Sequence, residues 1–302
     1  MIPPSSPMRR REERDGWLFA SPWLLGFLLF TVGPMIASAF FAFTEYDVLT
    51  QPKWVGWANF DKALTDDPKV GQALKVTSIY AVVSVPLQIL LGLCVALMLN
   101  TRIRGLQFYR TVYYLPSVLS GVAVALLWRW IYAPNFGLIN SFLARFDIVG
   151  PGWLGDKDWA LTSMIGMSLW HVGGGIVIYL AGLQGVPSEL YEAVRVDGAG
   201  RGAAFWHITL PMITPVLFYN LVIGIITALQ IFTQALIMTN GGPHEATLFI
   251  VLYLYRNAFQ FFKMGYASVL AWILFGYILM LTLLVYRSSG FWVFYAGELK
   301  SR

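Results

Sequence analysis

The sequence predicts an all-α membrane protein with six transmembrane helices and both termini in the cytoplasm. Three observations lead to this fold class. Hydrophobic residues make up 57% of the chain, only 12% are charged, and the mean hydropathy is +0.63, whereas a soluble domain needs roughly a quarter of its residues charged. The apolar residues gather into runs of about 18 or more, which suffices to cross a bilayer as a helix. The basic residues lie mostly near the ends of these runs.

The predicted spans divide the chain into a cytoplasmic N-terminal tail (1–16), a transmembrane domain (17–287) and a cytoplasmic C-terminal tail (288–302). Six apolar runs form the spans: 17–43, 74–99, 111–132, 161–183, 215–238 and 266–286.

Charge placement sets the predicted topology. With both tails inside, the inner segments carry more Lys and Arg than the outer ones, although the outer ones are longer overall. Basic residues near span ends are retained on the cytoplasmic side. The four arginines within 9–14 supply the strongest part of this bias, and the first run is too long for a cleavable signal peptide. Cys94 is the single cysteine, so no internal disulfide can form.

Two segments depart from plain apolar spans. Gly173, Gly174 and Gly175 interrupt the fourth run, and three glycines in succession either unwind a helix or let another group approach its backbone closely. Between the fifth and sixth runs, the aromatic-rich segment 247–262 is cut by Arg256 and fits an interfacial helix better than a span, although a membrane-crossing helix is the alternative.

The sequence lacks the usual motifs for energy coupling or catalysis. None of its lysines follows a glycine, so there is no P-loop to hold ATP. Secondary transporters usually keep acidic residues inside the membrane, whereas the ionisable residues in these runs are Lys75, Arg129 and His171. The three histidines are far apart, unlike the ligands of a metal site. Any energy must come from a partner, and His171 is most simply a hydrogen-bonded structural histidine.

The segment 187–211 between the fourth and fifth runs is short, charged and rich in small residues. It predicts a helix with Ser188 as N-cap, a reversal at the glycines from Gly198, and a second helix from about Ala203, with Pro211 marking entry to the fifth span. Its small residues suit a close fit in a groove on another protein. A helical hairpin that merely links two spans is the simpler alternative.

The same segment carries a recognisable spacing: Glu192–Ala193, then Gly198, then nine residues and the sequence ITLP. This resembles the EAA loop of the permeases of binding-protein-dependent ABC importers. The stretches "YEAVRVDGAG", "ITLPMITPV", "TNGGP", "SPWLLGFLLFTVGPMIASAFFAFTEYD" and "WVFYAGE" resemble the carbohydrate-uptake branch, the maltose and glycerol-phosphate type. The likeness covers nearly the whole chain. Val194 departs from the alanine usual at the third position.

The resemblance implies the fold of a type I ABC importer permease and a coupling role for the loop. It implies that one set of residues docks on the ATPase: Glu192, Ala193, Asp197, Gly198, Ala199, Ile208, Leu210 and Pro211. It implies a second homologous permease, two ATPase subunits that bind ATP and Mg, an extracytoplasmic solute-binding protein, and the plasma (inner) membrane of a bacterium or archaeon. This chain itself would be non-catalytic and bind no cofactor or metal.

Polar residues inside the apolar runs mark a possible path for a sugar. Asn220, Thr227, Gln230 and Gln234 recur at helical spacing on the fifth run, which predicts one polar face. On the fourth run, Trp170, His171 and Gly174 could add an aromatic platform and exposed backbone groups, as a sugar requires. Hydrogen bonds between helices, with no solute, are the alternative use of these groups.

The predicted function is therefore half of the translocation pathway of an ATP-driven sugar importer. Two other classes remain open at this stage. A secondary transporter or channel would work without ATP, and a membrane scaffold would not need the polar residues of the fifth run.

Overall fold

A computed structural model of the chain describes residues 7–101 and 104–294, and most of them are helical. Residues 1–6 and 295–302 of the predicted tails, including most of the C-terminal "WVFYAGE" stretch, lie outside the described residues. The chain divides into two compact units, which are described separately. One comprises residues 1–66 and 254–272, the other residues 67–253 and 273–302.

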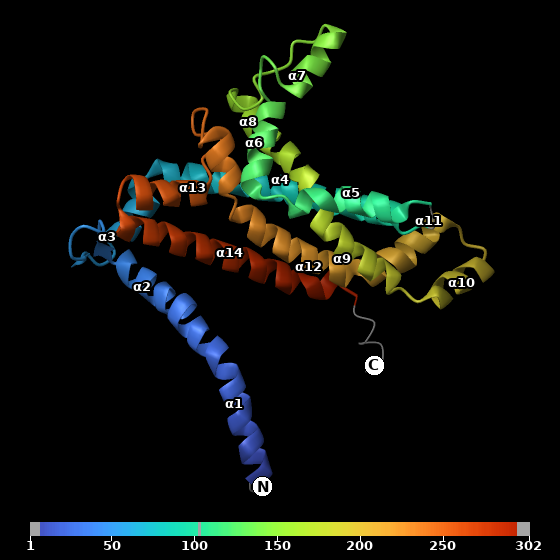
Figure 1. The fold of residues 1–302 in the computed structure, drawn as a ribbon, viewed down its shortest axis with the longest axis horizontal. Coiled ribbons are helices and arrows are strands. Elements are labelled where there is room, and N and C mark those ends of the chain that lie inside the picture. The colour runs from blue at the N-terminus through green and yellow to red at the C-terminus, as the bar shows by residue number, and fades with distance from the viewer. Residues whose placement is uncertain (1–6, 102–103, 295–302) are drawn as a thin grey trace. The chain divides into compact units, whose positions relative to one another are not determined.

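The first unit begins with one long helical run. It consists of α1 (Pro7–Phe27), a π-helical turn η1 (Leu28–Val32) and α2 (Gly33–Ala42), shown in blue in Figure 1. The π turn immediately precedes Gly33 and Pro34. Because proline has no N–H and its ring crowds the preceding turn, an interior proline favours such an irregularity. The predicted span 17–43 therefore lies, apart from Phe43, in one apolar helical run, Arg11–Ala42.

A small β-hairpin follows α2 in the first unit. Strands β1 (Thr44–Glu45) and β2 (Lys53–Trp54) pair antiparallel, with Thr44 opposite Trp54. The side-chain amide of Asn59, in α3 (Ala58–Asp61), donates to the carbonyl oxygens of Ala42 and Thr44, which ties α3 to the hairpin. The π turn η2 (Lys62–Asp66) follows α3. The unit also holds η7 (Arg256–Gln260) and the start of α14 (Met264–Trp292).

Three helices form the core of the second unit: α4 (Pro68–Leu99), α9 (Gly173–Gln184) and α12 (Leu210–Leu229). Small residues lie where these helices meet. A Cβ atom at Gly224 of α12 would lie 2.9 Å from Val85 of α4, and one at Gly182 of α9 would lie 2.7 Å from Val216 of α12. Small residues let membrane helices approach closely, where packing rather than water exclusion holds them together.

The third and fourth predicted spans are not straight helices. Residues 111–132 fall in α5 (Leu106–Val118) and α6 (Gly121–Ile131), which meet at 99°. Leu119 and Ser120 are extended at this bend, and the Ser120 hydroxyl accepts from the Ala123 N–H, so α6 starts as a separate capped helix. Residues 161–183 fall in α8 (Lys157–Ser168), the 3₁₀ turn η4 (Leu169–His171) and α9, with a 47° bend.

The fifth predicted span, 215–238, has different limits. A continuous helix starts in α11 (Arg201–Ala204), passes through the π turn η5 (Phe205–Thr209) and ends with α12 at Leu229. The separate π turn η6 (Ala235–Thr239) holds the end of the predicted span. By contrast, the predicted spans 74–99 and 266–286 lie within α4 and α14, which are each long and apolar enough to cross a membrane.

Short elements complete the second unit. They are α7 (Leu138–Leu143), the 3₁₀ turn η3 (Ala144–Phe146), α10 (Ser188–Val196) and α13 (Ile250–Tyr255). The 6 residues of α13 and the 5 of η7 account for the helical part of segment 247–262. Together they are about 16 Å long, and a bilayer core is about 30 Å thick. A membrane-crossing helix there is therefore disfavoured.

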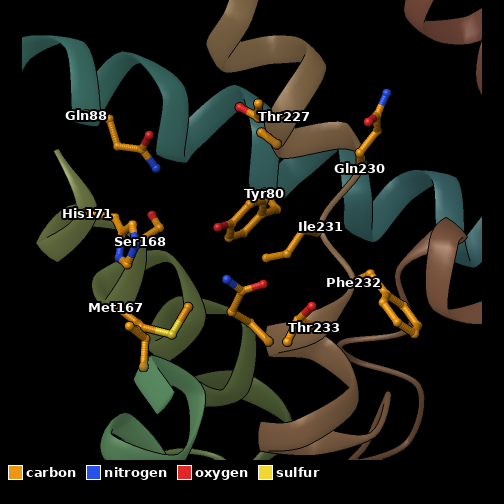
Figure 2. A pocket seen from close by; sticks show the side chains of 13 residues that line it. Tyr80, Gln88, Met167, Ser168, His171, Thr227, Gln230, Ile231, Phe232 and Thr233 are labelled. Carbon is orange, nitrogen blue, oxygen red and sulfur yellow. The ribbon is translucent and has the colours of Figure 1, made fainter. Parts of the chain in front are cut away.

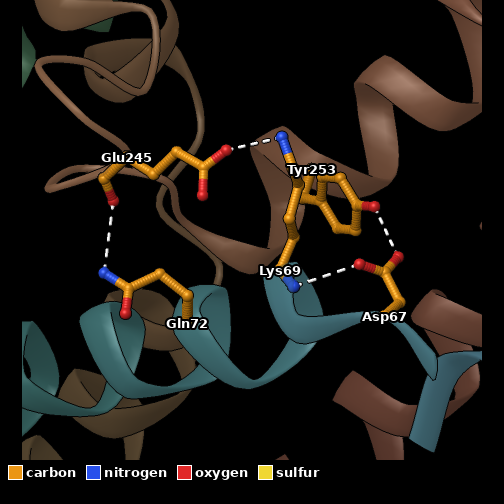
Figure 3. A network of polar contacts seen from close by, with 5 residues as sticks. All are labelled: Asp67, Lys69, Gln72, Glu245 and Tyr253. Carbon is orange, nitrogen blue, oxygen red and sulfur yellow. Dashed lines mark hydrogen bonds and ion pairs between the residues drawn. The ribbon is translucent and has the colours of Figure 1, made fainter. Parts of the chain in front are cut away.

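A polar network joins the start of α4 to the loop before α13 (Figure 3). Lys69 pairs with the Glu245 carboxylate at 2.5 Å, and the Gln72 amide donates to the Glu245 carbonyl oxygen at 3.5 Å. The Asp67 carboxylate accepts from the Lys69 N–H at 3.0 Å and from the Tyr253 hydroxyl at 2.5 Å. Asp67 thus caps α4 and holds α13 against it.

We expect Asp67→Ala to lower the stability of the protein by about 2 kcal/mol. The substitution removes both a helix N-cap and a hydrogen bond to a charged acceptor, each of which contributes about 1 kcal/mol or more. The measurement is the thermal unfolding midpoint of the purified protein in detergent. Asp66→Ala is the control, because the side chain of Asp66 accepts only from the exposed Thr65 hydroxyl among the described side-chain bonds. Equal midpoints for both variants would contradict the prediction.

Candidate functional site

A polar cavity lies beside the core of the second unit (Figure 2). Its volume is about 290 Å³. Helix α4 contributes Tyr80 and Gln88, and the α8–η4 segment contributes Ser168 and His171. The remaining polar groups come from the end of α12 and the segment after it: Thr227, Gln230, Thr233 and Gln234. Hydroxyl, amide and imidazole groups dominate, so the cavity suits a ligand rich in hydroxyl groups.

The break at the end of α12 builds one wall of this cavity. Gln230 leaves the helix with φ −104° and ψ 15°, and Gln234 precedes η6. The predicted single polar face of Asn220, Thr227, Gln230 and Gln234 is therefore wrong, because the helix ends at Leu229. The break nevertheless places Thr227, Gln230 and Gln234 on the same cavity.

A second cavity of about 420 Å³ shares Gln88, His171 and Thr227 with the first. Asn220 and Gly174 line it, together with Gly175 and Tyr179 of α9. The Asn220 amide donates to the Val216 carbonyl oxygen, and the Thr227 hydroxyl donates to that of Ile223. These two residues therefore bond to their own helix, which leaves the Asn220 amide oxygen and a Thr227 lone pair for other partners.

Trp170 takes a different place from the one expected. Its ring lies edge-on to Trp128 of α6, with the ring centroids 6.1 Å apart. It packs on an apolar cluster that includes Tyr132 and Met238. The aromatic rings that line the first cavity are instead those of Tyr80 and Phe232. Trp170 packs in this apolar cluster and lines neither cavity, so it does not form the predicted aromatic platform.

Sequence reasoning missed several cavity residues, and one of them had a readable signal. Gln88 is a lone amide inside the apolar run 74–99, where a polar side chain needs a partner or a water-lined cavity. Tyr80, Ser168, Phe232 and Thr233 carry no such signal, because hydroxyl and aromatic side chains are common in membrane helices.

The loop between α9 and α11 is an exposed hairpin, at the far end of these helices in Figure 1. Helix α10 ends in a Schellman arrangement: the Ala199 N–H donates to the Val194 carbonyl oxygen, and the Gly198 N–H donates to that of Arg195. Gly198 has φ +76°, a left-handed conformation that glycine adopts at little cost. The predicted reversal at Gly198 is therefore confirmed.

The start of α10 differs from the prediction. Pro187, not Ser188, occupies its N-cap, and no side chain caps the helix there. The predicted second helix is present. It starts at Arg201, close to the expected Ala203, and continues into α12, so Pro211 lies inside a continuous helical run. The π turn η5 precedes Pro211 and accommodates its missing N–H and bulky ring.

The predicted coupling residues fall into two groups. Those of α10 and the turn are exposed: Glu192, Ala193, Asp197, Gly198 and Ala199. Ile208 and Leu210 instead pack against the apolar cluster at the C-terminal ends of α4 and α9, and Pro211 lies beside them, partly buried. The Tyr191 hydroxyl lies 2.9 Å from that of Thr209, which joins α10 to the following helix. The hairpin thus exposes α10 and the turn after it, while the start of the following helix packs against the core of the unit.

Long apolar helices around a polar cavity, with an exposed helical hairpin, define a membrane transport component as the class of this protein. The chain belongs to the family of binding-protein-dependent transport system inner membrane components, whose model matches residues 88–293. It is therefore a membrane permease component of the ABC transporter type.

Individual relatives are consistent with this family. The chain is 44% identical to a probable ABC transporter permease protein, YesP, of Bacillus subtilis, over 96% of this chain and 94% of that protein. It is 33% identical to the multiple sugar-binding transport system permease protein MsmF of Streptococcus mutans, over 86% and 90%. A solved bacterial ABC transporter that imports the acidic polysaccharide alginate has a chain with a TM-score of 0.82 and 26% identity, over 94% of this chain and 98% of that chain.

Proposed function

We propose that this protein is one permease subunit of an ATP-driven importer for a sugar or sugar-like solute and forms half of the translocation pathway. The observation that carries the proposal is the exposed hairpin 187–211, which connects α9 to α12, two helices that line the second cavity. The lactose permease protein LacF and the multiple-sugar protein MsmF among the relatives support a sugar as the solute.

The connection between hairpin and cavity suggests how coupling works. Helix α9 enters the hairpin at Gln184, and α12 leaves it through α11. Gly174 of α9 and Asn220 of α12 both line the second cavity. A displacement of the hairpin by a closing ATPase dimer would therefore move two walls of the pathway together. ATP binding would open the pathway toward the binding protein, and hydrolysis would reset it.

We assign two roles to the residues of the hairpin: some contact the ATPase subunit, and others hold the hairpin against the rest of the permease. Glu192, Ala193, Asp197, Gly198 and Ala199 are proposed to dock in a cleft of the ATPase subunit, with Glu192 facing a basic group there. Ile208, Leu210 and Pro211 are proposed to hold this surface in place through the apolar cluster beneath it.

The proposed pathway residues are those that line the two cavities. His171, Gly174, Asn220, Thr227, Gln230 and Gln234 would offer amide, imidazole, hydroxyl and backbone groups to the sugar hydroxyls. Stacking on a sugar ring would fall to Tyr80 or Phe232 rather than Trp170.

The proposed topology has six spans and both termini in the cytoplasm of a bacterium or archaeon. Four spans are the long apolar helices, and each bent pair, α5 with α6 and α8–η4 with α9, forms one broken span. Backbone breaks at membrane depth are tolerated where they line a cavity, as His171 and Gly174 do here.

The proposed assembly supplies what this chain lacks. A second homologous permease would complete the pathway, two ATPase subunits would bind ATP and Mg, and a solute-binding protein would deliver the sugar. This chain is proposed to be non-catalytic and to bind no cofactor or metal.

Purification of the tagged chain from its native membrane tests the assembly. We expect a second permease and an ATPase pair to co-purify, and their ATPase rate to rise when a sugar-loaded binding protein is added. An intact chain that transports solute without any associated ATPase would overturn the proposal in favour of a secondary transporter or channel.

We expect Gln230→Leu and Gln234→Leu to reduce sugar-stimulated ATPase activity about tenfold each. Loss of one hydrogen bond in a polar site corresponds to about 1–1.5 kcal/mol, or roughly that factor. Gln260→Leu is the control, because it makes the same change at an exposed residue of η7. Assembly is checked by co-purification of the ATPase. Unchanged activity in both cavity variants would contradict the assignment of the cavity to the pathway.

A further inference from the structure

We propose that a third hollow, at the C-terminal end of α6, binds the headgroup of an anionic phospholipid, with Arg129 as the ligand of its phosphate. The hollow has a volume of about 550 Å³. Arg129 lies in its wall among apolar and aromatic side chains, which include Leu126, Trp130, Tyr132, Phe136 and Met238. The site lies outside the sugar pathway proposed above, and it requires only that the chain is a membrane component.

The direction of the Arg129 side chain separates this hollow from the pathway. Val124 of α6 lines the first polar cavity. Each residue of a helix turns by about 100°, so Arg129 lies about 140° around the helix from Val124 and Leu126 about 200°. The cation therefore lies on the far side of α6 from the polar cavity, where a translocated sugar would not reach it.

The charge of Arg129 lacks a counter-ion within the part of the chain that the structure describes. No ion pair or side-chain hydrogen bond of Arg129 occurs there, and the hollow is lined by no carboxylate among the described residues. Arg129 is itself exposed, so its guanidinium is open to a ligand from outside the chain. Guanidinium groups bind phosphate oxygens through two parallel hydrogen bonds, which makes a phosphate a well-matched partner.

The walls of the hollow fit the rest of a phospholipid. Leu126 is 52% exposed, Trp130 51% and Phe136 65%, so they form an open apolar surface next to the cation. In a membrane component such side chains face acyl chains, and tryptophan and tyrosine concentrate at the level of the headgroups. If the headgroup of a phospholipid binds Arg129, the acyl chains of that lipid would lie along these apolar residues. In the proposed topology the C-terminal end of α6 faces outward, so the headgroup would belong to a lipid of the outer leaflet.

Lipid binding to the purified transporter tests the site. The intact complex is reconstituted into vesicles of phosphatidylcholine with about one fifth phosphatidylglycerol, extracted in mild detergent, and the lipids that remain bound are counted by native mass spectrometry. We expect the wild type to retain phosphatidylglycerol over phosphatidylcholine, and Arg129→Gln to reduce this retention about fivefold. Arg129→Lys should keep part of the preference, because it keeps the charge but not the paired hydrogen bonds.

The control is Arg145→Gln, which removes the same charge from an exposed residue of η3. It should retain the lipid as the wild type does. Equal retention by the wild type and Arg129→Gln overturns the proposal. So does a loss of the second permease from the Arg129→Gln complex with lipid retention unchanged, since Arg129 would then pair with a neighbouring protein. Equal loss in Arg129→Gln and Arg145→Gln would also overturn it, because net charge alone would explain the binding. Co-purification of the ATPase reports separately on the proposed function.

Discussion

Replacement of Gly198 by valine is expected to reduce ATP-driven uptake tenfold or more while the protein remains folded in the membrane. Gly198 has φ +76°, and nothing lies within 4 Å of the position that a Cβ would occupy. The cost is therefore backbone strain rather than a clash. A left-handed conformation costs an ordinary residue roughly 1–2 kcal/mol, and a β-branched residue rarely adopts it. The turn would relax, and α10 would change its direction.

The matched control for Gly198→Val is Gly200→Val. Gly200 lies two residues further on in the same exposed turn, also with open space around it, but its φ of −79° and ψ of 172° suit valine. Uptake and co-purification of the ATPase are measured for both variants. If the turn geometry couples the two subunits, only Gly198→Val loses them. Equal losses would show that added bulk, not the reversal, matters.

Replacement of Gly173 by alanine is expected to destabilise the protein by about 1–3 kcal/mol, as overpacking of a close helix contact does. A Cβ atom on Gly173 would collide with the backbone of α5, at the Tyr113 carbonyl oxygen and at Tyr114 Cα. A backbone cannot turn aside as a side chain does, so α5 and α9 would have to separate.

Gly174→Ala is a control on the next residue, where a Cβ would meet nothing within 4 Å. We expect the thermal unfolding midpoint in detergent to fall for Gly173→Ala and to stay near the wild-type value for Gly174→Ala. Because Gly174 lines the second cavity, its variant is compared by stability and not by transport. A midpoint that falls equally in both would contradict the prediction, because alanine favours a helix more than glycine does and only Gly173 contacts α5.

The triple glycine shows how far sequence reasoning reached. It predicted either an unwound helix or a close approach to the backbone. The glycines themselves are helical, because α9 starts at Gly173, and the helix changes direction before them, at η4. The close approach is confirmed, since a Cβ on Gly173 would collide with the backbone of α5. The alternation of apolar runs and charged loops likewise placed α4 and α14 and the exposed hairpin, because burial in lipid demands long apolar stretches.

Other features depended on tertiary contacts that a sequence pattern does not record. The end of α12 at Leu229 has no proline or glycine beside it, and the residues up to Met238 keep a helical pattern of apolar side chains. By contrast, the bend at Leu119 and Ser120 lies between Pro116 and Gly121, so the sequence did carry a signal for it. Trp170 was assigned to the pathway by its neighbours in sequence, although the partner that fixes it, Trp128, lies on another helix.

ATP-driven uptake by the reconstituted transporter tests the central claim most directly. The purified complex is placed in proteoliposomes with ATP and Mg on the ATPase side, and a panel of labelled oligosaccharides is supplied with the cognate binding protein on the other side. We expect accumulation of a sugar that requires hydrolysable ATP and the binding protein, persists when ionophores remove proton and sodium gradients, and is lost in Gly198→Val. Accumulation driven by an ion gradient in the absence of ATP would contradict it.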